Sequence, residues 1–163
     1  MTSLQEKLAS AVHLRETGKH QEARQLLLEL YNEFPNDPQI NYQSAWIHDL
    51  LGLEREAVPF YEKSIQAGLN GDDLKSALLG LGSTYRCIGE YQKSIAMFQQ
   101  ALRLFPTSHE FNVFLAMAYY NIGEHAKAME LLLNSLVNTS NDEGVLRYQR
   151  PIRFYSDKLD QTW

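Results

Sequence analysis

The stretch that decides the fold runs from Lys75 to Ile95 and reads KSALLGLGSTYRCIGEYQKSI. Two amphipathic segments flank Gly89, where a tight turn between antiparallel helices is expected, because glycine adopts a left-handed conformation without a Cβ penalty. A small residue lies seven positions before this glycine, at Gly82, and another lies five positions after it, at Ser94. Small side chains at both places allow two helices to approach closely. The stretch therefore predicts a helix–turn–helix unit.

The same pattern recurs along the chain, in register with this unit. The turn glycines follow one another at intervals of 34, 37 and 34 residues: Gly18, Gly52, Gly89 and Gly123. The small residues that flank the turns are Ala11, Ala45, Gly82 and Ala116 before them and Ala23, Ala57, Ser94 and Ala128 after them. The bulky residues expected to fill the space between repeats are Leu27, Tyr61, Phe98 and Leu132. A repeat of this period predicts stacked helix pairs.

These residues resemble the tetratricopeptide repeat, whose signature is small–turn–small–aromatic–proline on a 34-residue period. Pro35 and Pro106 supply the proline that closes the second helix of a repeat. The resemblance implies an all-α fold, a right-handed α-solenoid of four helix–turn–helix units over residues 1–142. The repeats are expected at about residues 4–37, 38–71, 75–108 and 109–142.

Two departures from the repeat carry local predictions. The three extra residues of the 37-residue interval are expected in the loop around Asn70–Leu74, with Asp72 or Asp73 as the helix N-cap. Pro59 lies inside the second helix of the second repeat, where it is expected to remove one hydrogen bond and bend the helix.

Residues 143–163 follow the repeats and predict a C-terminal capping helix, kinked near Pro151. Its apolar stripe recurs at spacings of 3, 4, 3 and 4 residues: Val145, Tyr148, Ile152, Tyr155 and Leu159. Arg147, Arg150 and Arg153 form a basic row on the opposite side. The row is interpreted as a solvated face, with contact to an acidic partner as the alternative.

Composition excludes several classes of function. The chain has 163 residues and a net charge of −5, from 15 Lys and Arg against 20 Asp and Glu, which disfavours nucleic acid or an anionic membrane as the main partner. A single Cys excludes an internal disulfide and a zinc site built from cysteines. The sequence from Met1 to Lys7 does not resemble a secretory signal, and no apolar run is long enough to cross a bilayer. A cytoplasmic location is therefore expected.

The resemblance also implies a binding surface, because the first helix of each repeat lines the concave side of the solenoid. The expected groove residues are Leu8, Val12, Arg15, Tyr42, Trp46, Asp49, Leu79, Ser83, Arg86, Val113, Phe114, Met117 and Tyr120. Their aromatic and aliphatic character with scattered charges suits an extended peptide or an amphipathic helix of a partner protein. The alternative is that Trp46 and Phe114 pack inside the superhelix.

Binding of the acidic C-terminal tail of a heat-shock chaperone is not expected. In the repeat proteins that bind such tails, a clamp of Lys, Asn and Arg holds the terminal carboxylate. The matching positions in this chain are Leu8, Val12, Gln43, Ser76 and Gly80. None of them carries the cation that a terminal carboxylate requires.

No catalytic constellation, metal site or cofactor is predicted, so the chain is interpreted as a non-enzyme. His13 and His48 are expected to pack in first helices, without a second ligand at helical spacing. Cys87 has no histidine placed to act as its base and is expected to be a buried or half-buried structural thiol.

A narrower resemblance joins the chain to a family of small stand-alone bacterial tetratricopeptide proteins. It is carried by residues 45–62, 78–84 and 153–157, and it suggests dimerisation without adding a mechanism. The leading hypothesis is an adaptor that binds a peptide or helix of a partner protein in the concave groove. The alternative is a self-assembling homodimer, with a seam at Phe154, Tyr155 and Trp163 or along the first helix from Leu4.

Overall fold

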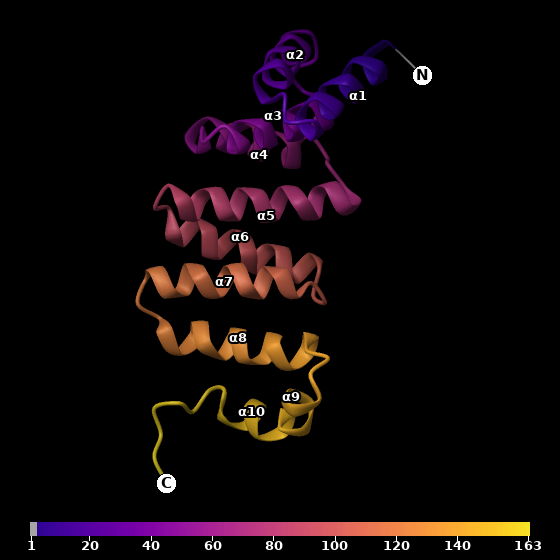
Figure 1. Cartoon of the computed structure of the whole chain (residues 1–163). Helices are drawn as coiled ribbons and strands as arrows, with labels where there is room; N and C mark the ends of the chain where they lie inside the picture. The colour runs from indigo at the N-terminus through magenta and orange to yellow at the C-terminus, as the bar shows by residue number, and fades with distance from the viewer. Residues whose placement is uncertain (1–2) are drawn as a thin grey trace. The chain divides into compact units, whose positions relative to one another are not determined.

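The computed structural model describes residues 3–163, and within that range the chain folds into ten helices and no strands (Figure 1). The helices are α1 (Ser3–Glu16), α2 (His20–Glu33), α3 (Pro38–Leu50), α4 (Glu54–Gln66), α5 (Gly71–Cys87), α6 (Tyr91–Leu104), α7 (His109–Asn121), α8 (His125–Thr139), α9 (Glu143–Arg147) and α10 (Gln149–Tyr155). The predicted all-α fold class is confirmed. The chain divides into two compact units, Met1–Ile88 and Gly89–Trp163, so that α5 belongs to the first unit and α6 to the second.

The helices of a pair are joined by the predicted glycine turns. All four turn glycines have a left-handed φ, which is 79° at Gly18, 70° at Gly52, 84° at Gly89 and 82° at Gly123. At three of the turns, the residue after the glycine donates its backbone N–H to the carbonyl five residues earlier: Lys19 to Leu14 (2.9 Å), Leu53 to His48 (2.9 Å) and Glu124 to Tyr119 (3.0 Å). This bond closes the end of the preceding helix and requires the left-handed residue between its partners.

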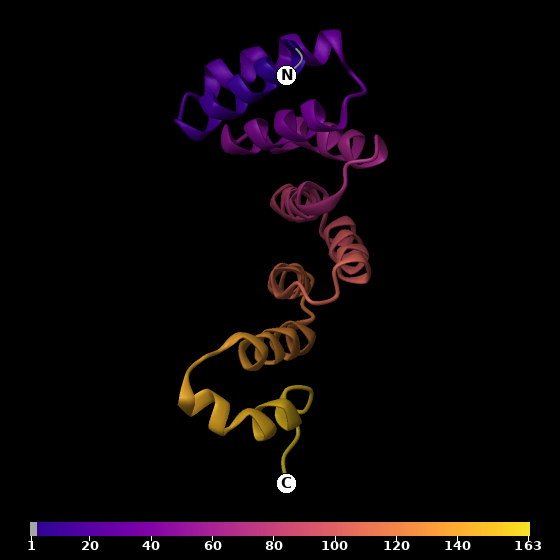
Figure 2. The ribbon, with the colours of Figure 1, turned by 90° about the vertical axis from the view of Figure 1, so that its right-hand side faces the viewer.

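In the first unit, small residues allow the helices to pack closely. α1 packs against α2, α3 packs against α4, and both α1 and α5 contact α3 (Figures 1 and 2). The alanines on either side of the turns are fully buried: Ala11, Ala23, Ala45 and Ala57. Leu27 and Tyr61, predicted to fill the space between repeats, are 1% and 3% exposed. Burial of large side chains against alanines stabilises the stack.

In the second unit, aromatic packing forms the core. α7 packs against α6 and α8, and α10 contacts α8. Phe98 is fully buried between Phe111 and Phe114, with ring centroids 6.5 and 6.0 Å away. The prediction for Leu132 is wrong, because its side chain stays 39% exposed. Within residues 3–163, α8 is followed by the short helices α9 and α10, which leave this side chain partly uncovered.

The insertion near Asn70 is helical and does not lengthen the loop as predicted. α5 begins at Gly71 and has 17 residues, whereas α3 and α7 each have 13. Asp72 and Asp73 therefore lie in the first turn of α5, and neither is the N-cap. Asp73 Oδ2 accepts a hydrogen bond of 2.6 Å from Gln39 Nε2 of α3. This bond helps to fix the added turn against α3.

Pro59 does not interrupt its helix, since α4 runs without a break from Glu54 to Gln66. The proline cannot donate a backbone hydrogen bond to the carbonyl of Arg55. Both residues are exposed, so water can satisfy that carbonyl.

The predicted capping helix is split into α9 and α10 at Tyr148, three residues before Pro151. A proline disfavours a continuous helix here, because it lacks the N–H and its ring clashes with the carbonyl four residues earlier, that of Arg147. The predicted apolar stripe is not buried as a whole. Val145 and Ile152 are half-buried, whereas the other members are exposed: Tyr148, Tyr155 and Leu159.

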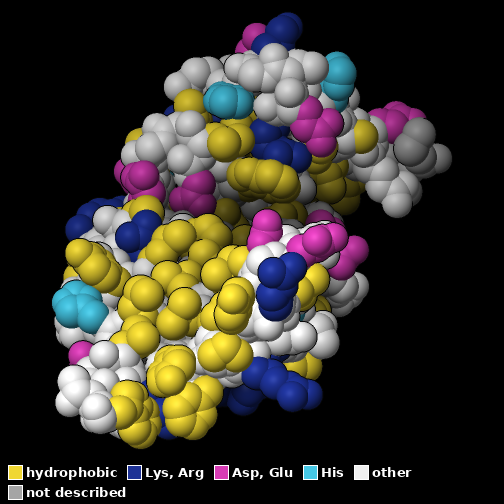
Figure 3. Space-filling view, turned by 60° about the horizontal axis from the view of Figure 1, so that its bottom comes forward, with side chains coloured by type: hydrophobic (Ala, Val, Ile, Leu, Met, Phe, Trp, Pro, Cys, Tyr) yellow, Lys and Arg dark blue, Asp and Glu magenta, His cyan; other side chains and the backbone are white. Residues whose placement is uncertain are grey.

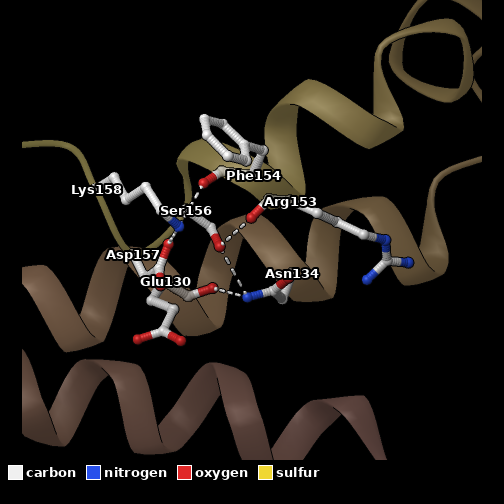
Figure 4. A network of polar contacts seen from close by, with 7 residues as sticks. All are labelled: Glu130, Asn134, Arg153, Phe154, Ser156, Asp157 and Lys158. Carbon is white, nitrogen blue, oxygen red and sulfur yellow. Dashed lines mark hydrogen bonds and ion pairs between the residues drawn. The ribbon is translucent and has the colours of Figure 1, made fainter. Parts of the chain in front are cut away.

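A polar contact at its C-terminal end joins α10 to α8 (Figure 4). Asn134 Nδ2 donates to the Glu130 carbonyl at 2.9 Å and to Ser156 Oγ at 3.3 Å. Ser156 is 4% exposed and donates to the Arg153 carbonyl at 2.9 Å. Polar groups therefore contribute to the attachment of this segment alongside its half-buried apolar side chains, such as Ile152.

Candidate functional site

The predicted groove residues of the first unit lie at positions i, i+4 and i+7 of α1, α3 and α5. We call this set the first-unit face: Leu8, Val12, Arg15, Tyr42, Trp46, Asp49, Leu79, Ser83 and Arg86. Residues at this spacing share one side of a helix. Because α1 and α5 each contact α3, the three rows belong to neighbouring helices.

Burial divides the first-unit face into two layers. Arg15 is 9% exposed and Tyr42 is 3% exposed, so both lie beneath the surface. Little of the Tyr42 ring, or of the Arg15 side chain, is therefore accessible at the surface. Burial raises the pKa of the Tyr42 hydroxyl above its ordinary value. The remaining residues of the face are half-buried and keep part of their surface accessible.

Trp46 connects the two layers. The Arg15 guanidinium carbon lies 3.6 Å from the centroid of the Trp46 ring, and the Tyr42 ring centroid lies 5.7 Å from that of Trp46. A guanidinium stacked on an indole gains cation–π attraction and has a fixed orientation. Trp46 is half-buried, so it packs against its neighbours and also keeps an accessible surface.

Asp49 is held by two hydroxyl groups. Its Oδ2 accepts a hydrogen bond of 2.8 Å from Tyr61 Oη, and Thr84 Oγ1 lies 3.0 Å from both carboxylate oxygens. Burial raises the pKa of Asp49, although these hydrogen bonds act in the opposite direction. Burial and the neighbouring Asp49 charge also raise the pKa of Tyr61, so its hydroxyl stays protonated as the donor. The carboxylate is therefore oriented by α4 and α5.

The sequence pattern did not predict that Tyr61, Thr84 and Gly80 belong to this site. Tyr61 was predicted only as a bulky residue that fills the space between repeats, and Gly80 was considered only as a position that matches the chaperone clamp. The Thr84 hydroxyl also lies 2.8 Å from the Gly80 carbonyl. A contact between Gly80 and Tyr61 could have been predicted from their sizes, because a small residue on one helix makes room for a large aromatic residue on the next. No comparable pattern in the sequence identified Thr84.

In the second unit, the predicted residues of α7 are more exposed. Val113 and Phe114 are half-buried, and Phe114 packs on the core residue Phe98 as the alternative interpretation had it. Met117 is 40% exposed and Tyr120 is 65% exposed. The Tyr120 ring lies against His125, with 4.8 Å between centroids.

The C-terminal part of the second unit carries many exposed apolar side chains. Phe154, Tyr155 and Trp163 form one aromatic cluster, with ring centroids 5.1, 6.0 and 6.5 Å apart. Further exposed residues of this part of the chain are Met129, Leu132, Leu136, Leu146, Tyr148 and Leu159. Figure 3 shows hydrophobic side chains gathered on this part of the surface.

Two of the three expectations about single residues are wrong. His48 is buried at 3% exposure and stacks on Phe60, which confirms its packing role. His13 is exposed instead of packed. Cys87 is also exposed, since it is the last residue of α5 and borders the turn at Gly89. Sequence spacing placed both residues on helices but did not determine which side faces solvent.

Across residues 3–163, no group of three or more His, Cys, Asp or Glu side chains is arranged to hold a metal ion. A separate search of the described helices finds none that combines the length and the apolar character needed to cross a bilayer.

Comparison with known sequences matches the chain to a protein family. The sequence model of the family described as "Tetratrico peptide repeat" matches residues 38–159. Aspartyl/asparaginyl beta-hydroxylase of Homo sapiens is 25% identical over 148 residues, and that of Mus musculus is 24% identical over the same length. Each alignment covers 86% of this chain but only 20% of the hydroxylase. The chain therefore spans a fifth of the length of these curated relatives.

Comparison with solved structures shows the same architecture. A crystal structure of MamA has a TM-score of 0.76 at 16% identity, and covers 90% of this chain and 77% of that one. MamA 41-end from Desulfovibrio magneticus RS-1 has a TM-score of 0.74 at 18% identity, with coverages of 94% and 88%. A chain of the APC/C hetero-tetramer Cut9-Hcn1 has a TM-score of 0.73 at 17% identity, with coverages of 90% and 29%. At these identities the likeness shows the fold alone.

Proposed function

The chain belongs to the tetratricopeptide repeat family, and from that premise we propose that it is a protein-interaction adaptor that binds a peptide or helix of a partner protein. Stacked helix pairs present extended surfaces, and the repeat fold is generally a scaffold for protein contacts rather than for catalysis. The proposed repeats are those predicted from the sequence, at about residues 4–37, 38–71, 75–108 and 109–142, with residues 143–163 as the cap.

The observation that carries this proposal is the half-buried surface of the first-unit face. Leu8, Val12, Trp46 and Leu79 come from three neighbouring helices and keep part of their apolar surface accessible. Partly exposed aromatic and aliphatic side chains of this kind act as anchors for a peptide. In the second unit, Met117 and Tyr120 are proposed as further contact residues, because both are exposed on α7.

The test is affinity capture from a lysate of the source organism. The baits are the wild-type chain and a variant with Trp46→Ala and Tyr120→Ala, which circular dichroism must show to be as helical as the wild type. A protein enriched by the wild type alone supports the groove adaptor. A partner captured equally by both baits would show that these side chains are not the binding site.

Self-association is the second candidate function, favoured by the exposed aromatic cluster of Phe154, Tyr155 and Trp163. Large exposed apolar patches mark interaction sites on soluble proteins. Sedimentation equilibrium over a range of protein concentrations is the direct test. Dimerisation that is lost on deleting residues 158–163 supports a C-terminal seam, whereas a monomer at every concentration excludes it.

Hydroxylase activity is not proposed for this chain. The two named hydroxylases extend far beyond the aligned region, which accounts for 20% of their length. The proposed role requires no catalytic residue and no cofactor. The cytoplasmic location and the bacterial origin of the protein stay predictions from the sequence.

A further inference from the structure

We propose that a second copy of this chain packs against α8 in a closed two-fold dimer, with a stripe of exposed apolar side chains on α8 at the centre of the interface. We call this set the α8 stripe: Met129, Leu132 and Leu136. The inference rests on self-association, the second candidate function, and adds its surface and its symmetry. The α8 stripe shares no residue with the first-unit face, so a dimer would carry two copies of the proposed peptide-binding face.

The first argument is that the residues equivalent to this stripe are covered in the other repeats. Leu132 lies nine residues after its turn glycine, and the residues at that position in the first three repeats are 1%, 3% and 0% exposed: Leu27, Tyr61 and Phe98. The residues that match Leu136, thirteen positions after the glycine, are half-buried: Tyr31, Ile65 and Leu102. Leu132 and Leu136 are instead 39% and 46% exposed.

The covering element in those repeats is the first helix of the following repeat. α2 packs against α3, α4 against α5, and α6 against α7. After α8, α10 is bonded through Asn134 and Asn138, which lie on another side of α8 from Leu132 and Leu136. The α8 stripe is therefore shaped to receive one more helix. In a two-fold dimer each α8 supplies that helix to the other copy, because the same surface of both copies meets.

The second argument is the amount of apolar surface in this part of the chain. The exposed large apolar side chains from Met129 to Trp163 together present on the order of 800 Å², taking about 150–250 Å² for a large side chain at full exposure. Figure 3 shows hydrophobic side chains gathered on this surface. A stable complex takes about 800 Å² from each partner, whereas the largest patch on a monomer is about 300–600 Å². The surface is therefore large enough for a second copy.

The third argument is that the charges in this part of the chain suit contact with a copy of itself. Residues 143–163 carry four basic and three acidic side chains. A two-fold interface brings each patch against itself, so a patch of one sign would repel its copy, whereas a mixed patch can pair opposite charges. Arg147 and Arg150 are exposed, as are Glu143 and Asp160, so both signs are available for contacts between copies.

The experiment is sedimentation equilibrium of the full-length chain across the micromolar range. The test variant carries Leu132→Gln with Leu136→Gln, and the control carries Leu50→Gln with Leu104→Gln. The two control leucines are the last residues of α3 and α6, are 46% and 53% exposed, and lie outside the α8 stripe. Glutamine has a helix propensity close to that of leucine, so both variants should keep their helices, which circular dichroism checks. Leu132→Gln alone replaces the test variant if the double substitution lowers helicity.

We expect the mass of the wild type to rise with concentration and to level off at twice 18.8 kDa. The control should give the same curve. The Kd of the test variant should be about 100-fold higher or more, because each substitution removes buried apolar surface from both copies.

The outcomes separate this inference from the proposed functions. A test variant that dimerises like the control would overturn the α8 stripe as the interface and leave self-association intact. A mass that grows beyond twice that of the chain would overturn the two-fold arrangement, because a head-to-tail contact does not close at two copies. A wild type that is monomeric at every concentration would overturn both this inference and self-association, and would leave the adaptor function to its own test. Monomers that float with vesicles of phosphatidylcholine and phosphatidylglycerol would also overturn it and would assign the surface to lipid.

Discussion

The Tyr61 side chain occupies the space into which a side chain at Gly80 would project. A Cβ at position 80 would lie 2.5 Å from Tyr61 Oη and 2.6 Å from Tyr61 Cζ. The ring cannot easily move aside, because Tyr61 is 3% exposed and donates a hydrogen bond of 2.8 Å to Asp49. The contact of α4 with α5, and with it the place of Asp49, therefore depends on the absence of a side chain at position 80.

We predict that Gly80→Ala destabilises the protein by about 1–3 kcal/mol, as overpacking of a core does. In an exposed helix the same substitution would stabilise by about 1 kcal/mol, because alanine has a higher helix propensity than glycine. A loss of stability would therefore come from packing and not from helix propensity. Urea unfolding followed by circular dichroism measures the difference. An unchanged or higher free energy of unfolding would show that Tyr61 can move at little cost.

A double-mutant cycle attributes this cost to Tyr61. In a Tyr61→Leu background, the Tyr61 atoms nearest to position 80 are absent, so Gly80→Ala should cost less than it does in the wild type. Ser83→Ala, at a half-buried position one turn later on α5, is the control on the same helix. If Gly80→Ala lowers the free energy of unfolding equally in both backgrounds, its effect does not come from contact with Tyr61.

The half-buried carboxylate of Asp49 predicts a pH dependence of stability. Its pKa is raised from 3.8 by burial, so the folded state keeps this proton to a higher pH than the unfolded state does. The free energy of unfolding should therefore fall as pH rises from 3.8 through the raised pKa. Asp49→Asn removes this contribution, so its stability relative to the wild type should increase over that interval. Parallel pH profiles of the two proteins would contradict the prediction.

His48 predicts a dependence of opposite sign. Burial lowers its pKa from 6.5, although its bond to the Ser44 carbonyl acts in the opposite direction. Nδ1–H donates to that carbonyl at 2.6 Å, and Nε2 accepts from Arg24 Nε at 3.2 Å, which requires the neutral ring. Stability should be lost as pH falls below 6.5, because the unfolded state takes up the proton first.

His48→Phe keeps a ring against Phe60 but does not titrate. At neutral pH, the unfolding free energy of this variant is expected to be lower than that of the wild type, because the substitution removes the bond between Arg24 and His48. The difference from the wild type should shrink as pH falls below 6.5. A difference that stays constant across this range would exclude His48 as the source of acid sensitivity.

Cys87 is predicted to react with a thiol reagent in the folded protein. Its side chain is exposed and borders an open hollow of about 420 Å³, which Arg55 and Glu56 also line. Ellman's reagent should modify one thiol per chain without denaturant, and the modified protein should keep its helicity. Modification that occurs only after unfolding would contradict the exposed placement.

Local spacing was sufficient to predict the turns and most of the packing. Gly18, Gly52, Gly89 and Gly123 were identified by interval alone, and all adopt a left-handed φ. Position in the repeat also predicted the burial of Leu27, Tyr61 and Phe98. The prediction failed for Leu132, because burial at that position depends on the helices that follow the repeat and not on the pattern within the repeat.

For the candidate site, the residue spacing predicted positions on helices but not how deeply each side chain is buried. The spacing i, i+4 and i+7 places Arg15, Trp46 and Asp49 on one side of their helices. It does not reveal that Arg15 lies beneath Trp46, or that Tyr61 and Thr84 approach Asp49 from other helices. These relations depend on the distance and rotation between helices, which many side chains determine together.

The sequence by itself determined the all-helical fold, the repeat period and the turns, because each depends on residues close together along the chain. The tertiary structure decided which side chains of that pattern are buried, paired or accessible. It extended α5 by a turn, divided the C-terminal helix at Tyr148 and exposed Cys87. The physical reason is that burial and hydrogen bonding are set by contacts between helices distant in sequence, whereas helix and turn formation are set by local backbone preferences.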